Sequence, residues 1–383
     1  MLSWDKLRRC KLHLRLRSHS GEDNPALQAQ MSCARVVKSF LMHRRTRRTL
    51  WILVAVLLLL ALAIFLRSKA PPEAARLLPE SDGILYINLK PVRAFLHKDL
   101  KPPSRVPEYQ QFVDATGIDW ERDLDQVAIA LHRMPDPNGP NGPVAYSMVL
   151  VGKLTGKRLN DWLDAHAASR ESYDGHTIYS IPSEGRTVRV AQIGYDALAV
   201  SNTPTPEQIH SMLDRHRTAA WPFAGSTLLN QHYHEVPLLA LAWGVGQIGM
   251  PFSERGAISI FGLSLPLEDD SIIVASATPA LSLNGSLAGS LDLKVEEIAA
   301  TDEVAARQAA SLATLVSVAR EFTAPLAANT ANNGLKQILE NAKVIANRNR
   351  VVVTATLTPS LLASLAQGET AQPASSPAPD ASK

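Results

Sequence analysis

Four acidic residues stand at alternating positions in the segment GIDWERDLDQV: Asp119, Glu121, Asp123 and Asp125. Alternating oxygen ligands are typical of calcium loops, but the glycine and the terminal bidentate glutamate of an EF-hand are absent. Paired carboxylates can also perform acid–base catalysis. We interpret the segment as a capped turn that leads into a strand near residue 127. Asp119, Asp123 and Asp125 are the first candidates if the protein is a hydrolase.

A glycine motif of the GxGxxG type follows the apolar segment LLALAW, at Gly244-Val-Gly246-Gln-Ile-Gly249. This motif is typical of dinucleotide sites when it opens a helix whose N-terminus holds the pyrophosphate. Pro251 follows almost at once, and the next expected strand begins near residue 257. That spacing leaves no room for the helix, so we interpret the glycines as the exit of a strand and predict no cofactor.

Other patterns typical of catalytic or metal sites are incomplete. The segment His232-Tyr-His234-Glu235 lacks a third ligand at a suitable spacing, and we interpret it as a polar turn before Pro237. The sequence contains no GxSxG, HExxH or P-loop motif. We therefore predict no catalytic, cofactor-binding or metal-binding residues.

One segment is apolar enough to cross a membrane. Residues 50–66 read LWILVAVLLLLALAIFL, 17 uncharged residues in succession. As a helix they extend roughly 25 Å, close to the thickness of a bilayer core. We predict one transmembrane helix here, with Trp51 at an interface and Leu58 and Phe65 among the residues that anchor it in lipid.

The charges beside this segment predict its orientation. Cations are more numerous before it than after it, and the nearest are Arg44, Arg45, Arg47 and Arg48. The positive-inside rule then places the N-terminus in the cytoplasm and the body in the periplasm, with an uncleaved signal anchor in the inner membrane. The sequence does not decide whether translation starts at Met1, Met31 or Met42.

The net charge of +3 is the sum of two different parts. Residues 1–50 hold 12 Lys and Arg against 3 Asp and Glu, whereas the remainder is mildly acidic. An acidic body argues against nucleic acid as a partner, because phosphate binding needs clustered cations. The basic arm, residues 1–49, is either disordered or an amphipathic segment on anionic lipid. Both cysteines, Cys10 and Cys33, lie in this arm, so the body has no disulfide.

The body has the pattern of an α+β protein with mostly antiparallel sheet and packed helices. Its strands and helices occur in runs, and the hairpin-then-helix order of residues 186–213 returns at residues 343–365. We therefore predict two related units, residues 77–220 and 225–366. Residues 367–383 have the composition of a disordered tail.

Three segments of the first unit resemble a family of uncharacterised bacterial proteins with a single membrane anchor. They are LLPESDGILYINLKPVRAFL (77–96), TGIDWERDLDQVAIAL (116–131) and VLVGKLTGKRLNDWLDAH (149–166). The resemblance implies an exported, membrane-tethered body of the cell envelope. It implies no catalytic residue.

We expect a non-enzymatic envelope protein whose body binds or scaffolds another envelope protein or component. The expected partners are thus the lipid bilayer and another envelope protein; the oligomeric state is not predicted. An envelope hydrolase with an unrecognised site and a membrane-tethered sensor are the alternatives.

Overall fold

The structure is a computed structural model that describes residues 49–62, 70–96, 107–218, 225–247, 257–260, 263–266, 271–281, 287–323 and 330–359. The chain separates into two compact units, Met1–Ser68 and Lys69–Lys383.

In the first unit, residues 49–62 are helical, and the side chains of Trp51 and Leu58 are 64% and 65% exposed. No helix within the described ranges has both the length and the apolar character that a bilayer crossing requires. The other residues expected to anchor or orient the membrane segment lie outside those ranges: Phe65, Arg44, Arg45, Arg47 and Arg48.

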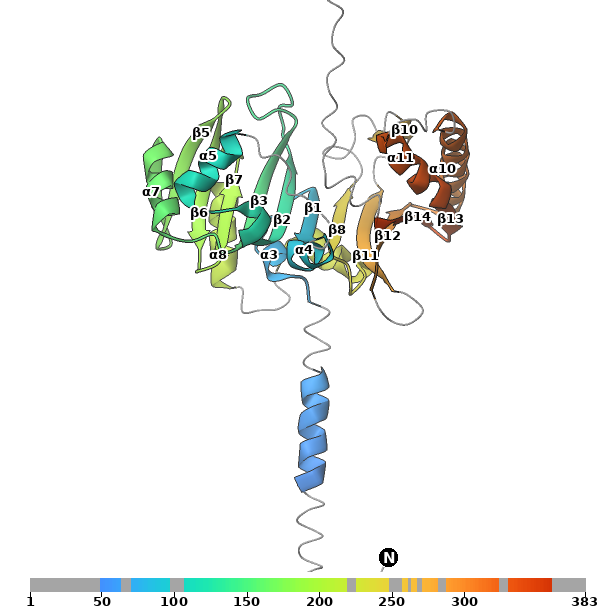
Figure 1. The fold of residues 1–383 in the computed structure, drawn as a ribbon, viewed down its shortest axis with the longest axis horizontal. Coiled ribbons are helices and arrows are strands. Elements are labelled where there is room, and N and C mark those ends of the chain that lie inside the picture. The colour runs from blue at the N-terminus through green and yellow to red at the C-terminus, as the bar shows by residue number, and fades with distance from the viewer. Residues whose placement is uncertain are drawn as a thin grey trace, which may run out of the picture. The chain divides into compact units, whose positions relative to one another are not determined.

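The second unit is α+β, as the sequence predicts, and it is built on one large antiparallel sheet. In the described part of the chain, twelve strands follow the order β13-β14-β12-β11-β8-β1-β2-β3-β7-β6-β5-β4 (Figure 1). The strands are β1 (Gly83–Asn88), β2 (Leu124–Arg133), β3 (Val144–Gly152), β4 (Ser169–Tyr173), β5 (His176–Ser183), β6 (Arg186–Ile193), β7 (Ala197–Ser201), β8 (Ala242–Gln247), β11 (Ile272–Leu281), β12 (Leu287–Ile298), β13 (Lys343–Asn347) and β14 (Arg350–Leu357).

A separate hairpin joins β9 (Ala257–Ile260) to β10 (Leu263–Pro266). The helices of this unit are α3 (Glu73–Arg76), α4 (Leu89–Leu96), α5 (Pro107–Thr116), α6 (Trp120–Asp123), α7 (Lys157–His166), α8 (Glu207–Arg217), α9 (Thr227–His232), the 3-10 helix η1 (Tyr233–Glu235), α10 (Asp302–Thr323) and α11 (Thr330–Asn341).

Strands β1 and β8 form the centre of the sheet, although they are far apart in sequence. They pair antiparallel, with Tyr86 opposite Trp243 and Leu85 opposite Gly244. The rings of Tyr86 and Trp243 stack with their centroids 5.4 Å apart, and both side chains are only 4% exposed. Burial raises the pKa of Tyr86 to about 12, so the phenol stays neutral.

The face of the sheet that bears Ile84, Tyr86, Trp243 and Val245 is called the α8 face here. Because side chains alternate along a strand, directly paired residues share this face. Helices α3, α8 and α9 contribute to its core, and α8 does so through Ile209, Met212 and Leu213. These positions are apolar at helical spacing after Pro206, which occupies the N-cap position of α8.

The opposite face, called the α7 face, has a core around Leu124, Leu150, Val190 and Leu198. Helix α7 covers it through Leu159 and Leu163. At the far end of the sheet, α10 lies against β13 and β14 (Figure 1). The strand register puts Val344 and Val351, which pack with α10, on this same face.

Several elements differ from the sequence prediction. Strand β4 follows α7 directly, in a segment where the sequence predicts no strand. The apolar residues 237–243 predict a strand, but this strand begins only at Ala242, because residues 238–239 form a turn after Pro237. The single strand predicted at 257–265 is instead the hairpin of β9 and β10. The sequence does not show where the chain turns within these short apolar segments, because leucine and alanine occur both in their turns and in their strands.

We expect Trp243→Ala to lower the free energy of unfolding by about 3–5 kcal/mol, the usual cost of removing a buried aromatic side chain. Chemical denaturation of the purified chain measures this. Tyr195→Ala is the control, since Tyr195 is 95% exposed, and it should change stability by less than about 0.5 kcal/mol. Equal effects of the two substitutions would contradict the packing described for β1 and β8.

Candidate functional site

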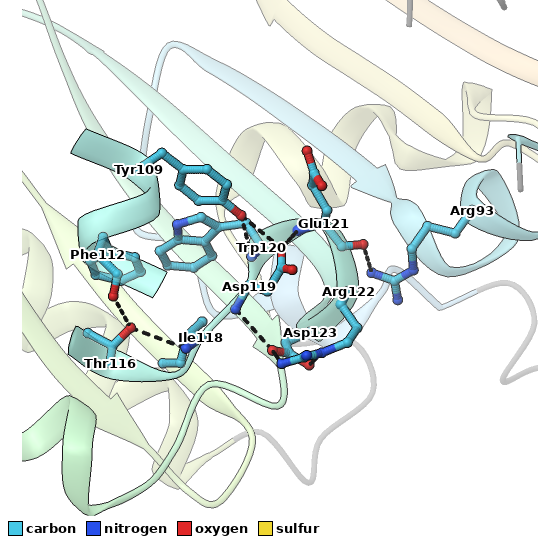
Figure 2. Close-up of polar contacts among 10 residues, drawn as sticks. All are labelled: Arg93, Tyr109, Phe112, Thr116, Ile118, Asp119, Trp120, Glu121, Arg122 and Asp123. Carbon is cyan, nitrogen blue, oxygen red and sulfur yellow. Dashed lines mark hydrogen bonds and ion pairs between the residues drawn. The ribbon is translucent and has the colours of Figure 1, made fainter. Parts of the chain in front are cut away.

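The acidic cluster folds into a capped turn, as the sequence predicts (Figure 2). Asp119 is the N-cap of α6: its Oδ1 accepts a hydrogen bond from the backbone N–H of Glu121 at 3.1 Å. The same oxygen accepts the hydroxyl of Tyr109 at 2.9 Å, and that hydroxyl accepts the N–H of Trp120 at 2.9 Å. Burial and the Asp119 carboxylate raise the pKa of Tyr109.

Asp123 closes the turn from its other end. Its Oδ2 accepts the backbone N–H of Asp119 at 3.0 Å, and Arg122 binds both carboxylate oxygens at 2.8 and 2.6 Å. The Arg122 guanidinium lowers the pKa of Asp123, which therefore stays ionised at neutral pH. Gly152 lies against this turn, and a Cβ there would meet the carbonyl oxygen of Asp123 at 2.0 Å.

The remaining members of the cluster serve the same local structure. Arg93 of α4 pairs with Asp125 and donates to the carbonyl oxygen of Glu121 at 3.2 Å. Beneath the turn, the rings of Phe112 and Trp120 stack at 5.4 Å. The carboxylates of Asp119, Asp123 and Asp125 are thus all engaged in capping, or in pairing with arginine, which is a structural role.

A second polar cluster lies on the α8 face of the sheet, among residues that form no recognisable sequence motif. His132 Nε2 lies 2.9 Å from Ser147 Oγ, which lies 3.3 Å from Ser201 Oγ. Ser201 Oγ is in turn 2.8 Å from Thr203 Oγ1. These side chains come from β2, β3, β7 and the segment after β7. All of them are on the α8 face, in register with the apolar core.

A serine hydroxyl beside a histidine can act as an activated nucleophile. Here Ser147 has no exposed surface and His132 is 6% exposed, so no substrate reaches them in the folded protein. Burial lowers the pKa of His132 and keeps the imidazole neutral. We interpret the chain of hydroxyls as a buried network that satisfies its own hydrogen bonds. Polar residues at inward-facing positions of three apolar strands were its only signal in the sequence.

The histidine-rich segment before Pro237 also has a structural role. Glu235 of η1 accepts two hydrogen bonds from the guanidinium of Arg350 in β14, at 2.8 and 2.6 Å. Arg350 is the main cause of the lowered pKa of Glu235. In the described part of the chain, no group of three or more His, Cys, Asp or Glu side chains could hold a metal ion.

The glycine motif lies within β8 as far as it is described; Gly249 is outside the described residues. Gly244 packs against β1, and a Cβ there would come within 2.7 Å of Leu85 Cδ2. The close approach of β1 therefore explains why residue 244 is glycine. Gly244 and Gly246 both lie within strand β8 and do not open a helix.

The two ends of the sheet differ in a way that bears on binding. Strand β4 carries Arg170 and Glu171, which pair with Asp164 and His210 at 3.0 and 2.9 Å. Strand β13 reads KVIAN, with one charge and with Ile345 55% exposed. No described strand pairs with the outer side of β13, so it presents unpaired backbone groups. Charges protect edges from pairing with other chains, and β13 has fewer of them.

No family model matches the chain, and no curated protein matches it. Among solved structures, crystal forms I, III and IV of TP0453 are similar over 77–78% of this chain and 96–98% of theirs. Their sequence identity is 12% and their TM-scores are 0.39–0.41. Because these scores are below 0.5, we draw no conclusion from the likeness.

We expect Asp123→Asn to destabilise the protein at neutral pH and much less in acid. The pKa of Asp123 is lower in the folded state than in the unfolded state. The ionised carboxylate therefore stabilises the fold above the unfolded pKa of about 3.9, and this stabilisation is lost as the pH falls through the folded pKa. Denaturation of both proteins between about pH 6 and pH 2 measures the difference. Asp161→Asn, which removes an exposed ion pair with Lys157, is the control. A difference that grows in acid would contradict this account.

We expect a fluorophosphonate probe to leave native Ser147 unlabelled, because the hydroxyl is fully buried. Ser147→Ala should lower the free energy of unfolding by about 1–3 kcal/mol, because the substitution removes a partner of buried His132. Mass spectrometry of the treated protein and denaturation of the variant check both results. Rapid labelling of Ser147 in the folded protein would support a hydrolase instead.

Proposed function

We propose that the protein is a membrane-anchored envelope protein whose periplasmic α+β body binds another envelope protein through the β13 edge. One observation carries the proposal: β13 is the less charged end of a twelve-stranded sheet, and no described strand pairs with its outer side. An extended segment of a partner could add a strand there, with main-chain hydrogen bonds giving affinity.

The anchor in this proposal is the apolar segment 50–66, with the cytoplasmic arm before it. The support is the sequence itself: 17 uncharged residues, flanked on the N-terminal side by Arg44, Arg45, Arg47 and Arg48. The described helix at 49–62 is compatible with such an anchor. The resemblance to membrane-tethered envelope proteins favours the same location.

We also propose that residues 77–220 and 225–366 are related units. The support is the strand order on either side of the central pair. In the first half, β1, β2 and β3 follow in order, and after α7 the last strand, β7, returns beside β3. In the second half, β8, β11 and β12 follow in order, and after α10 and α11 the last strand, β14, returns beside β12.

The edge proposal is tested by proline substitution with a matched control. In an antiparallel hairpin, every second residue points its backbone N–H and C=O groups away from the partner strand. Asn347 pairs with Arg350 next to the turn, so the residues of β13 whose N–H and C=O groups point outward are Ala346 and Val344. Ala346→Pro should therefore remove an outward N–H while leaving the pairing with β14 intact. Ser172→Pro does the same on the outer side of β4.

We expect a photocrosslinking amino acid at Ile345 to capture a partner in intact cells, and Ala346→Pro to abolish the capture. Ser172→Pro should leave it unchanged. The experiment uses the full chain, with circular dichroism of each variant as the folding control. Equal capture by a folded Ala346→Pro variant would contradict binding by strand addition.

A reporter enzyme that is active only in the cytoplasm, fused after Lys383, should be silent, because the proposed topology puts the body in the periplasm. The same reporter fused before Met1 should be active. Activity of the fusion after Lys383 would overturn the proposed orientation.

A further inference from the structure

The hairpin of β13 and β14 is cationic, although the body as a whole is mildly acidic. Residues 343–357 contain Lys343, Arg348 and Arg350 and no aspartate or glutamate. Arg350 is neutralised within the fold, because it donates two hydrogen bonds to Glu235. Lys343 and Arg348 are exposed, and neither has an ion-pair partner in the described part of the chain. Their charges therefore remain for a partner at the β13 edge.

Other cations near the two edges of the sheet are engaged, which sets Lys343 and Arg348 apart. Arg320 of α10, next to the start of β13, donates to the carbonyl oxygens of Leu339 and Ala342 at 2.7 and 2.6 Å. On the opposite edge, Arg170 of β4 pairs with Asp164 at 3.0 Å. The two edges thus differ in the charge that they offer as well as in its amount.

The strand register puts Lys343 beside the exposed apolar residue of β13. Lys343 lies opposite Thr354 and Ile345 lies opposite Val352, so Lys343, Ile345 and Asn347 share the α8 face. Helix α10 packs with Val344 on the other face, and Ile345 is 55% exposed. Lys343 and Asn347 are four residues apart, which is roughly 13 Å along a strand.

Arg348 has an unusual backbone conformation for a bulky residue. It begins the turn between β13 and β14 with a φ of 53°, in the left-handed region. Glycine, asparagine or aspartate usually occupies such a position. In the first unit, the hairpin turns that follow β4 and β5 begin with Asp174 and Glu184, also at positive φ. A cation at the turn of the β13 hairpin points to a use for its charge, since strained residues often have functional roles.

An open hollow of about 360 Å³ lies at this turn, where it is lined by Asn347, Arg348, Asn349 and Arg350. The side-chain amide of Asn349 donates to the carbonyl oxygen of Ala299 at 3.2 Å, and Arg350 binds Glu235. Arg348 is thus the lining cation whose charge no described residue neutralises. A carboxylate matches the fork of donors on a guanidinium, so the hollow suits an acidic side chain.

A second copy of the chain is the less suitable occupant of this edge. If two β13 strands paired antiparallel about Ile345, Lys343 of one copy would lie opposite Asn347 of the other and next to its Arg348. In a parallel pair in register, Lys343 would lie beside Lys343. Like charges on neighbouring strands destabilise their pairing.

We infer that the partner at the β13 edge is an acidic extended segment. One carboxylate lies opposite Lys343, an aliphatic side chain lies opposite Ile345, and a second carboxylate binds Arg348. These side chains alternate along the added strand, so the partner has the pattern acid-x-aliphatic-x-acid. The inference rests on the proposed function, because it specifies the partner of the edge proposed there. Main-chain hydrogen bonds supply affinity, and the three side chains supply specificity.

Peptide binding to the purified full chain tests this inference. The probe is a fluorescein-labelled peptide, Thr-Glu-Thr-Val-Thr-Glu-Thr, and its twins have glutamine or lysine in place of both glutamates. By fluorescence anisotropy, the acidic peptide should bind about threefold to tenfold more tightly than the glutamine twin, the size expected for two exposed ion pairs. The lysine twin should bind most weakly. At about 1 M salt the preference should largely disappear, because charges are then screened beyond about 3 Å.

Matched variants assign the preference to the two cations. Lys343→Gln combined with Arg348→Gln should make the acidic peptide and the glutamine twin bind equally. Lys343→Arg combined with Arg348→Lys is the control, because it keeps both charges, and it should retain the preference. Ala346→Pro should abolish the binding of all three peptides. A preference that persists in the double glutamine variant would contradict the role of Lys343 and Arg348.

The remaining outcomes separate this inference from the proposed function. Equal binding of the acidic peptide and the glutamine twin, abolished by Ala346→Pro, overturns the acidic partner and leaves strand addition standing. Binding of the acidic peptide that survives Ala346→Pro contradicts strand addition itself. If no peptide binds while Ile345 still captures a partner in cells, the inferred pattern is wrong and the proposed function stands. A covalent dimer, formed by the photocrosslinking residue at Ile345 in the purified chain alone, identifies a second copy as the occupant and overturns the inference.

Discussion

The pairing of β1 with β8 is the interaction on which the rest of the second unit depends. It joins strands that belong to opposite halves of the chain, and it buries the stacked rings of Tyr86 and Trp243. From this pair, directly opposed residues on the α8 face continue through Ala128, Val149 and Ala199, each with no exposed surface. Without this pairing, each half would expose an open edge of sheet.

The polar clusters in the described part of the second unit stabilise this sheet. Ser147 and His132 satisfy each other inside it, Asp119 and Asp123 cap the turn before β2, and Arg350 joins β14 to Glu235. Removing one partner of a buried polar pair costs more than the pair contributes, which explains why such groups occur together. Backbone and apolar groups remain exposed at the β13 border of the sheet, which is where we propose that a partner binds.

The sequence predicts local features of this fold well and long-range ones poorly. The alternation in GILYINL predicts β1, Thr205-Pro206 predicts the start of α8, and the acidic segment predicts the capped turn at Asp119, because neighbouring residues determine all three. The sequence does not predict the partner of Arg350 or the reason for Gly244, because both depend on contacts between segments that are far apart in the chain. The order β14-β12-β11-β8-β1 likewise depends on pairing across the whole chain. The acidic cluster could be recognised as a turn, whereas the buried serines gave no motif to find.

Native-state hydrogen exchange of the full chain tests the central claim most directly, since it measures the free energy at which each strand opens. If β1 and β8 join the two halves into one sheet, amides of β1, β3, β8 and β12 should exchange through the same global opening. Trp243→Ala should then lower all of their opening free energies together. Two separate opening energies, with only β8 and β12 responding to Trp243→Ala, would contradict the account.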